Sequence, residues 1–472
     1  MSQVPLVLDK KPVLGRYLDG RDNPSEWVRD KWSVIPDDVA HIITLGATGS
    51  GKTQSILRLA AAHLALGWRV FVIDAKEEYE PALALARYAC SLGVREERIR
   101  VWPWSGPIDL CRGTADAQKD RWMACAAYSE PYYAAVASSV LTLVCCGEGG
   151  PPTSPRQVIE LLDHRVLRAR WAGTDRAAIA AGLDAKAVQG VRYRYFNLIA
   201  GLEAIGGVSP KGGGFGWEDA DLVYLTLPSS TRLEIASAFG RSVLVDLVGY
   251  LRDPQRRTDH RPILFVVEEM GAIVSADQAV SLLVIEAVER ARSVNVRCIL
   301  SAQTPEGLGE SSSQIRLLHG GAAILAHRMA NPEPVVSLLG TKMGYEASLG
   351  VNVEGEILDR GSLREQHQWQ VAPDTMRRLP VGHALFAHAG RWSLTAVARL
   401  GDQAVSNTEP TRTRLVEHFA NFWKRIAKAS SADTVQVSAD GRRLPIKEIS
   451  NANQTRRPAR QARREHRGSR IW

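Results

Sequence analysis

The sequence has no apolar run that approaches the ~20 residues that a membrane-spanning helix needs. The longest candidate, residues 134–146, is short and contains serines and a threonine. The opening residues, MSQVPLVLDKK, also lack the apolar core and cleavage site of a signal peptide. We therefore expect the chain to be cytoplasmic, unless a partner holds it at a membrane.

Cysteine is scarce, with six residues in a chain of 472, and no two of them have the spacing C-x-x-C. Cysteines spread in this way through a long chain indicate reduced and mostly buried thiols. The pattern excludes a disulfide framework and a cysteine-based zinc site.

Positive and negative charges nearly balance over most of the chain. The net charge is +8, but residues 451–472 hold seven arginines and one glutamate, which gives this tail 7 − 1 = +6 and the other 450 residues 8 − 6 = +2. A low-complexity arginine run cannot bury enough apolar area to fold, so we expect the tail to be disordered. It suits phosphate backbones or an acidic partner surface. A solubilising tail without a partner is the alternative.

The motif that dominates the sequence is HIITLGATGSGKT at residues 41–53. A β-branched apolar run is followed by a glycine-rich turn and then by a helical pattern, which is the context of a phosphate-binding loop (Walker A). An accidental glycine-rich turn is the alternative. The residues expected to hold the nucleotide phosphates are Gly46, Ala47, Thr48, Gly49, Ser50, Gly51, Lys52, Thr53 and Gln54.

The side chains of this loop divide the chemistry between them. Glycines let backbone N–H groups crowd around the phosphates, and the start of the following helix adds a partial positive charge. Lys52 supplies a mobile cation, and the Thr53 hydroxyl can ligate Mg²⁺. We therefore expect ATP and Mg²⁺ as cofactors.

A second apolar strand, residues 68–74, ends at Asp74 and is followed by Lys76 and two glutamates. Ligands of open α/β sheets bind at the carboxyl ends of strands, which would place this acidic and this basic group beside the phosphate loop. The alternative is the glutamate-rich start of a surface helix.

A strictly apolar strand at residues 262–267 is followed by Glu268 and Glu269. Two adjacent carboxylates at a buried strand end require a cation nearby. We expect Glu268 to hold Mg²⁺ through water and Glu269 to act as general base on the attacking water. A pair of exposed strand-end acids is the alternative. Gln303 ends the next strand, 296–302, and could contact the γ-phosphate or cap its own loop.

Three arginines are candidates for stabilising transition-state charge from a neighbouring subunit. They are Arg290, Arg292 and Arg328. Arg328 is favoured because it follows a β-like run, and Arg292 comes next. An ordinary surface role is the alternative for each of them.

The expected fold class is α/β, with a mainly parallel sheet flanked by helices. Residues 41–113 and 217–400 form this ATPase domain, and residues 114–216, rich in Ala, Leu and Arg with helical spacing, form an all-α insertion. Residues 1–40 are a lead-in with one short helix near PSEWVRDKW. Further strands are expected at 319–326, 382–387 and 393–398. Residues 401–450 hold a closing helix, and 451–472 are the tail.

Four segments together resemble the FtsK/HerA superfamily of DNA-pumping ATPases, and within it the conjugative coupling proteins of the TraG/TraD type. They are GATGSGKT at 46–53, DAKEEYE at 74–80, LFVVEEM at 264–270 and ARSVNVRCILSAQTPEGLG at 291–309. Two residues depart from the family pattern, with Glu77 in place of a usual glycine and Glu268 in place of the usual metal-side aspartate. Coupling proteins also commonly begin with transmembrane helices, whereas this sequence has no apolar run of that length.

The resemblance implies a RecA-like fold and a hexameric ring, with ATP between subunits and DNA in a central channel. Relaxase or secretion-channel proteins are the implied partners. Phosphate contacts from this chain are expected first at Lys211, Arg456, Arg457, Arg463 and Arg464. A secretion ATPase that moves or recruits proteins is a second hypothesis. A docking module that binds nucleotide without motor activity is a third.

Overall fold

The structure is a computed structural model that describes residues 4–20, 27–76, 78–227, 233–252, 257–274, 278–351 and 357–400. Within these ranges, the side chains of residues 233, 273–274, 278–281, 292, 347–351 and 357–362 are not described. The closing helix and arginine-rich tail expected beyond residue 400, including Arg456, Arg457, Arg463 and Arg464, lie outside the described residues.

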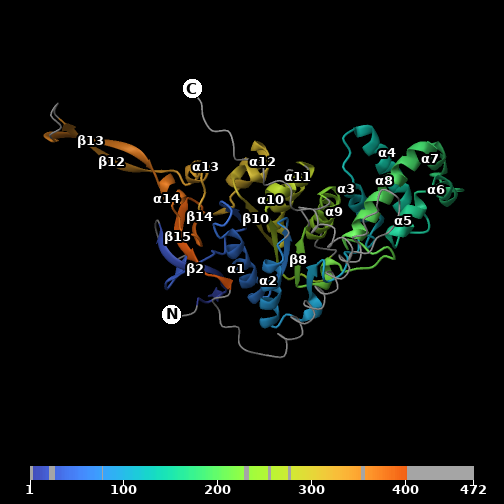
Figure 1. The fold of residues 1–472 in the computed structure, drawn as a ribbon, viewed down its shortest axis with the longest axis horizontal. Coiled ribbons are helices and arrows are strands. Elements are labelled where there is room, and N and C mark those ends of the chain that lie inside the picture. The colour runs from blue at the N-terminus through green and yellow to red at the C-terminus, as the bar shows by residue number, and fades with distance from the viewer. Residues whose placement is uncertain are drawn as a thin grey trace, which may run out of the picture. The chain divides into compact units, whose positions relative to one another are not determined.

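A large mixed sheet organises the chain, and its centre is parallel (Figure 1). Its parallel strands follow one another across the sheet in the order β11-β5-β10-β9-β6-β8-β7. Central parallel strands are covered on both faces, which explains their nearly continuous Val, Ile, Leu and Phe content. The strands are β5 (His41–Leu45), β6 (Arg69–Asp74), β7 (Ile99–Trp102), β8 (Leu222–Thr226), β9 (Ile263–Glu268), β10 (Val296–Ala302) and β11 (Ala323–Ala326).

The other half of the sheet is antiparallel and is built from both ends of the described chain. β14 pairs with β11, β15 with β14, and β2 with β15. The strands are β1 (Val7–Leu8), β2 (Lys11–Gly20), β3 (Val28–Arg29), β4 (Trp32–Val34), β14 (His383–His388) and β15 (Arg391–Val397).

This arrangement corrects the expectation for residues 1–40. The described part of PSEWVRDKW forms β3 and β4 instead of a short helix. Trp27 is buried and packs edge-on against Phe386 of β14, with ring centroids 5.0 Å apart. The burial of Trp27 and Trp32 against the sheet outweighs the local capping signal, since a short helix has little stability of its own. The expected strand at 319–326 is also shorter, because α12 continues to His319.

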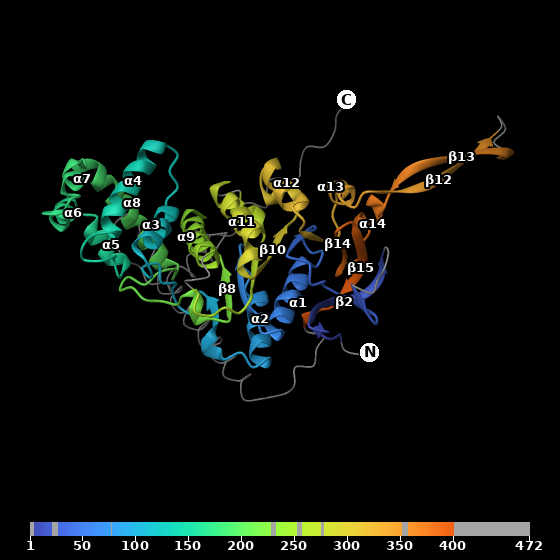
Figure 2. The same cartoon turned by 180° about the vertical axis from the view of Figure 1, so that it is seen from behind.

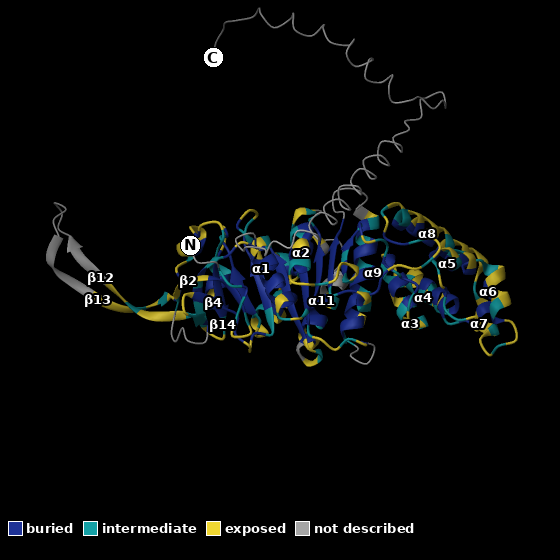
Figure 3. Cartoon of the chain, turned by 90° about the horizontal axis from the view of Figure 1, so that it is seen from below, coloured by how far each residue is buried: buried dark blue, intermediate teal, exposed yellow. Residues whose placement is uncertain are grey.

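Helices cover the sheet, and Figure 3 shows the strands between them as buried. The long α1 carries a continuous buried face that includes Ile56, Leu59 and Ala60. The helices outside the insertion are α1 (Lys52–Ala65), α2 (Glu80–Ser91), α9 (Leu233–Arg252), α10 (Met270–Val274), α11 (Gln278–Ala291), α12 (Ser311–His319), α13 (Glu333–Ser337) and α14 (Pro373–Arg377).

Residues 114–216 are helical in the structure, apart from their connections. Thr114, Ser154, Asp163 and Asp184 each cap a helix start with a side-chain oxygen, and the cap at Asp163 begins a new helix shortly after the preceding one ends at Leu161. The helices are α3 (Ala115–Cys125), α4 (Pro131–Cys145), α5 (Pro155–Leu161), α6 (His164–Trp171), α7 (Ala177–Gly182) and α8 (Ala185–Ala204).

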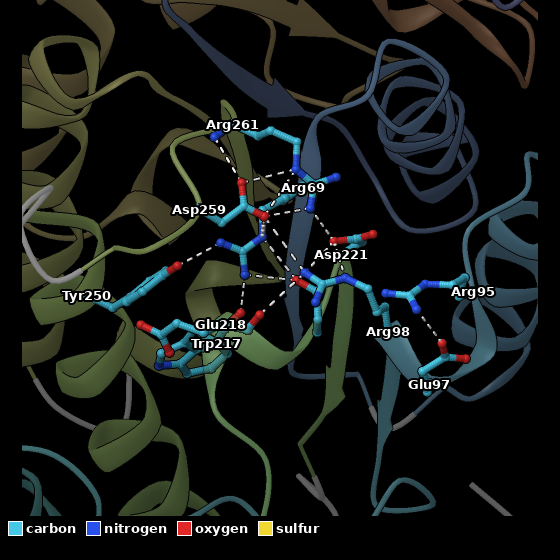
Figure 4. Close-up of polar contacts among 11 residues, drawn as sticks. Arg69, Arg95, Glu97, Arg98, Trp217, Glu218, Asp221, Tyr250, Asp259 and Arg261 are labelled. Carbon is cyan, nitrogen blue, oxygen red and sulfur yellow. Dashed lines mark hydrogen bonds and ion pairs between the residues drawn. The ribbon is translucent and has the colours of Figure 1, made fainter.

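A cluster of charged side chains lies at the amino ends of the parallel strands (Figure 4). Asp221, just before β8, binds Arg98 at 2.7 Å and Arg261 at 2.5 Å. Asp259 binds Arg261 at 2.6 Å, and the hydrogen bond from Arg261 lowers the pKa of Asp259 to about 2. Arg69, fully buried at the start of β6, donates to the Ala220 carbonyl at 3.0 Å. This cluster fixes the point where the chain re-enters the sheet after the insertion.

A separate two-stranded hairpin was not foreseen from the sequence. It consists of β12 (Thr341–Val351) and β13 (Ile357–Trp369), which pair with each other and not with the large sheet. Figures 1 and 2 both show these strands running outward from beside α13 and α14.

Candidate functional site

The carboxyl ends of adjacent parallel strands bring together motifs that are far apart in sequence. Strands β11, β5, β10, β9 and β6 lie next to one another in that order. β5 leads into the phosphate loop, β10 into Gln303, and β9 ends at Glu268. In the register of β6 with β9, Asp74 lies opposite Glu268. The sheet therefore assembles one site from the segments that the sequence singled out.

The phosphate loop has the backbone that its glycines predict. Gly46, Gly49 and Gly51 have φ values of +152°, +73° and +109°, which side chains rarely adopt. A Cβ on Gly46 would lie 2.7 Å from His327 Cβ, whereas one on Gly49 would meet nothing within 4 Å. The loop is thus packed against the protein at Gly46 and open to solvent at Gly49. Thr48, Gly49 and Gln54 are exposed there, and Ala47 is half-buried.

Three other segments support the loop from behind. Gly46 N donates to the Gln303 carbonyl at 3.3 Å, and Ala47 N donates to the Arg328 carbonyl at 2.8 Å. Gly382 N donates to the Ser50 carbonyl at 3.0 Å. The sequence did not single out Gly382, because its contact is made by a backbone group that any residue carries.

His327 is a second residue that sequence reasoning missed. It is fully buried at the end of β11, and its Nε2 lies 2.9 Å from Ser55 Oγ on α1. Burial, followed by the charge of Lys52, lowers the His327 pKa to about 4. The imidazole is therefore neutral at physiological pH. A polar residue directly after a buried strand and directly before Arg328 was the available signal.

Lys52 bends back over its own loop. Its Nζ donates to the carbonyl oxygens of Gly46 and, at 3.3 Å, Ala47. Burial and then the nearby Lys76 ammonium lower the Lys52 pKa, and Glu269 and Glu268 oppose that shift. A buried ammonium whose partners are neutral carbonyls is available to an incoming phosphate, which offers it full negative charge.

The expected metal side of the site is assembled around Glu268, which is 1% exposed. Thr53 Oγ1 donates to Glu268 Oε1, so the longer glutamate spans the distance to this hydroxyl. Lys76 Nζ lies 2.6 Å from the same carboxylate oxygen and 3.2 Å from Thr53 Oγ1. The basic group expected beside the phosphate loop is therefore Lys76, and its ammonium touches both expected metal ligands.

Asp74 lies beneath this group and binds protein atoms. It accepts from Lys76 N at 2.9 Å and from Tyr224 Oη at 2.9 Å. Burial, then the negative charge of Glu268, raises the Asp74 pKa to about 7. Burial alone would lower the Lys76 pKa, but Glu268 leads several carboxylates that together raise it. Asp74 thus holds the backbone that positions Lys76.

Glu269 and Gln303 meet across two neighbouring strands. Gln303 Nε2 donates to Glu269 Oε1 at 3.1 Å. Glu269 has a φ of +57°, a left-handed conformation that turns the chain directly after Glu268. The two consecutive glutamates therefore take different directions, one buried against Thr53 and the other half-buried beside Gln303.

The remaining expected residues have separate outcomes. Arg328 is half-buried and supports the loop through its carbonyl oxygen. Arg290 is exposed at the end of α11, and the Arg292 side chain lies outside the described residues. Lys211 is exposed on the connection that follows α8. Among the described side chains, the cations that face Glu268 and Glu269 are Lys52 and Lys76, and no arginine is paired with either glutamate.

The residues present fit a nucleotide phosphate and a divalent cation. The loop is open at Gly49, and the buried Ser50 Oγ has no hydrogen-bond partner among the described residues. A hydroxyl and a carboxylate are the oxygen ligands that Mg²⁺ takes beside phosphates. No group of three His, Cys, Asp or Glu side chains in the described ranges could hold a metal alone. A cation at Thr53 and Glu268 therefore needs oxygens from phosphate or water.

None of the described helices is long and apolar enough to cross a bilayer. No protein-family model and no curated protein matches the sequence.

The fold and the loop define a P-loop ATPase architecture, and solved structures share it. The bacterial conjugative coupling protein TrwBΔN70 is 14% identical, with a TM-score of 0.56 over 84% of this chain and 96% of that one. VirB4 of Thermoanaerobacter pseudethanolicus is also 14% identical, with a TM-score of 0.55 over 84% and 100%. TrwB bound to the ATP analogue ADPNP is 15% identical, with a TM-score of 0.52 over 84% and 97%. The resemblance of this fold to that of a coupling protein thus covers 84% of the chain.

Proposed function

We propose that this protein is a magnesium-dependent ATPase. The observation that carries the proposal is the meeting of Lys52, Thr53, Glu268, Glu269 and Gln303 at one edge of a parallel sheet. The coupling protein whose fold it shares has been seen with an ATP analogue bound. Thr53 and Glu268 would hold Mg²⁺, which would neutralise part of the negative charge of the phosphates.

Each side chain has a role in hydrolysis. Lys52 leaves its carbonyl partners and pairs with the β- and γ-phosphates. Glu269 accepts the proton of the attacking water, and the amide of Gln303 fixes the orientation of that carboxylate. Water oxygen then bonds to the γ-phosphorus while the bond to the ADP oxygen breaks, so ADP and phosphate are the products.

The arginine that completes this chemistry comes from another copy in our proposal. The described side chains around Glu268 and Glu269 supply two lysines and no arginine. Phosphoryl transfer gains greatly from an arginine on the γ-phosphate, often given in trans. Arg328 is the first candidate and Arg292 the second, in a homohexameric ring.

Hydrolysis would drive DNA through that ring, in conjugative transfer or in the mobilisation of another mobile element. The fold shared with a conjugative coupling protein supports a role in conjugation, and the +6 tail supports DNA as the cargo. Lys211 and the tail arginines are the proposed phosphate contacts. Relaxase or secretion-channel proteins are the proposed recruiting partners.

Protein transport is a second candidate function. VirB4 matches this fold as well as TrwB does, with a TM-score of 0.55 against 0.56. The fold therefore does not select the cargo. ATP turnover that DNA stimulates, with a stimulation that falls steeply as salt rises, favours a DNA motor. Turnover that no DNA changes favours a protein-moving ATPase.

Replacing Glu269 with Gln tests the ATPase directly. Loss of the base should lower turnover by about 10² to 10⁴-fold while ATP still binds, because Lys52 and the loop amides are intact. ATP hydrolysis and ATP binding are measured separately on the same purified protein. If E269Q stops hydrolysis but the protein keeps its cellular function, a nucleotide-dependent docking module replaces the motor. Full turnover in E269Q would refute the assigned base.

A further inference from the structure

The hairpin β12–β13 has two chemically different faces. Residues paired in register point to the same side of an antiparallel ladder, and the side alternates along each strand. Thr341 pairs with Trp369, Met343 with His367, and Tyr345 with Glu365. Leu363, two residues before Glu365, lies on this side as well. Four apolar side chains, Met343, Tyr345, Leu363 and Trp369, therefore lie on one face beside Thr341, His367 and Glu365, and we call it the apolar face of the arm.

The opposite face is polar. It carries the register pairs Lys342 with Gln368, Gly344 with Gln366, and Glu346 with Arg364. The alternation resembles that of a strand with one buried side, yet the apolar face is open. Met343, Tyr345, Leu363 and Trp369 are 51%, 64%, 68% and 42% exposed. Figure 3 shows the described part of the hairpin as largely exposed on the outside of the fold.

An isolated two-stranded sheet is marginally stable in water. This one has no third strand and no helix packed on it among the described residues. Exposed aromatic and aliphatic side chains on one side of such a ribbon indicate a protein contact. We propose that the apolar face of the arm docks on a second copy of this chain. The proposal rests on the proposed function, because that function requires neighbouring copies.

The position of the arm in the chain indicates that the partner of the apolar face is a second copy of this chain. After Arg328, which contacts the phosphate loop, the chain forms α13 and then the arm. It then passes through α14 to Gly382, which also contacts the loop. The carbonyl of Arg328 and the N–H of Gly382 both bind the loop. The arm is therefore inserted between two supports of the nucleotide site. A subunit that supplies an arginine to this site would lie beside the base of the arm.

The size of the arm supports the same occupant. β12 has 11 residues and β13 has 13. At about 3.3 Å per residue and ~10 Å for two strands, one face covers roughly 350 Å². A stable interface needs about 800 Å² per partner, so the arm must dock where other contacts exist. A neighbour at the nucleotide site offers them, and in a ring each copy both gives and receives an arm.

Two double variants of the full chain test the proposal. Tyr345→Thr with Leu363→Thr removes apolar area from the apolar face, while Thr keeps the strand propensity. Glu346→Thr with Arg364→Thr is the matched control, because it changes a paired position on the polar face and leaves the net charge unaltered. Oligomeric state is measured by sedimentation over a concentration series, with MgATP present. Nucleotide binding is measured in parallel by fluorescence of a labelled ATP.

We expect the Y345T/L363T chain to associate at least ~100-fold more weakly, since each large apolar side chain that is buried is worth about tenfold or more. The control should assemble like the parent chain. Equal association of both variants, or a parent chain that stays monomeric while it binds ATP, overturns the docking proposal and leaves the nucleotide site standing. Normal assembly through the arm without any ATP binding instead refutes the proposed function. An apolar-face variant that assembles normally but loses binding to lipid vesicles assigns the face to a membrane and also overturns it.

Discussion

Lys76 places a positive charge among the acidic and hydroxyl side chains that are proposed to bind the metal. Its ammonium lies 2.6 Å from Glu268 Oε1, 3.2 Å from Thr53 Oγ1 and 3.9 Å from Glu269 Oε2. Without this cation, buried Glu268 would lie opposite Asp74 with no ion-pair partner among the described side chains. Lys76 therefore offsets the cost of keeping acidic side chains together in a buried place.

Replacing Lys76 with Met should tighten the binding of a divalent cation. The substitution removes a positive charge that repels the metal and occupies its ligands, so the Kd for Mn²⁺ without nucleotide should fall by about tenfold or more. Electron paramagnetic resonance of free Mn²⁺ measures this constant. Lys76→Arg keeps the charge and should bind Mn²⁺ like the parent. Weaker metal binding by K76M would show that Lys76 organises the ligands more than it competes for them.

At the scale of elements, helix α1 and strand β10 are joined by a buried polar contact below the nucleotide site. His63 of α1 is fully buried, with its Nδ1 2.7 Å from the Leu59 carbonyl. Arg297 of β10 lies with Nη1 3.1 Å from His63 Nε2. The ring also packs edge-on against Trp68, with a centroid distance of 4.8 Å. Such a histidine must be neutral, because its neighbour is already a cation.

This contact makes the fold sensitive to acid. Burial, and then the charge of Arg297, lowers the His63 pKa from 6.5 to about 3. Between these values the unfolded chain binds a proton that the folded chain does not, so stability falls as the pH falls below 6.5. This group alone should reduce the free energy of unfolding by up to ~1.4 kcal/mol per pH unit.

The variant His63→Gln has no such proton to bind. Urea unfolding at a series of pH values from 7 to 5 should therefore give a shallower loss of stability than in the parent chain. The slope is the relevant quantity, because the substitution can shift stability at every pH by changing packing. An unchanged slope would mean that His63 is protonated in the folded protein as well.

At the scale of the whole molecule, positive charge is concentrated at one end of the sequence. Residues 451–472 carry +6 of the net +8. If these arginines hold DNA, a chain that ends at residue 450 should bind duplex DNA with a weaker salt dependence. The slope of log K against log salt should shrink by roughly 5 units or less, since each phosphate contact contributes about 0.9.

ATP turnover without DNA should be unaffected by this truncation, because the residues that build and support the nucleotide site lie between 46 and 382. A tail in which every arginine is replaced by lysine should restore the salt dependence, since the contacts are electrostatic. DNA binding measured by fluorescence anisotropy at several salt concentrations provides the slopes. Identical slopes for the full and shortened chains would assign the tail to another task.

Hydrophobic pattern and glycine placement were sufficient to predict the central part of the fold from the sequence. Strands β5, β6, β9 and β10 lie where apolar runs predicted them, and the insertion is helical as its periodicity indicated. Local chemistry also predicted that Gly46–Thr53 forms a phosphate loop. These features depend on residues that are close in sequence, so the chain carries them without reference to the rest of the fold.

The tertiary structure decided what depends on distant partners. Residues 11–20 became strand β2 because β15 offered an edge to pair with. His327 and Gly382 entered the site because strand order and register, which cannot be read from the sequence, brought them to the loop. The exposed arm could not be recognised from the sequence, because a two-stranded ribbon with one open apolar face has the same alternation of apolar and polar residues as a half-buried strand. Pairing across the sheet, and not local propensity, determines these positions, and so it determines the site.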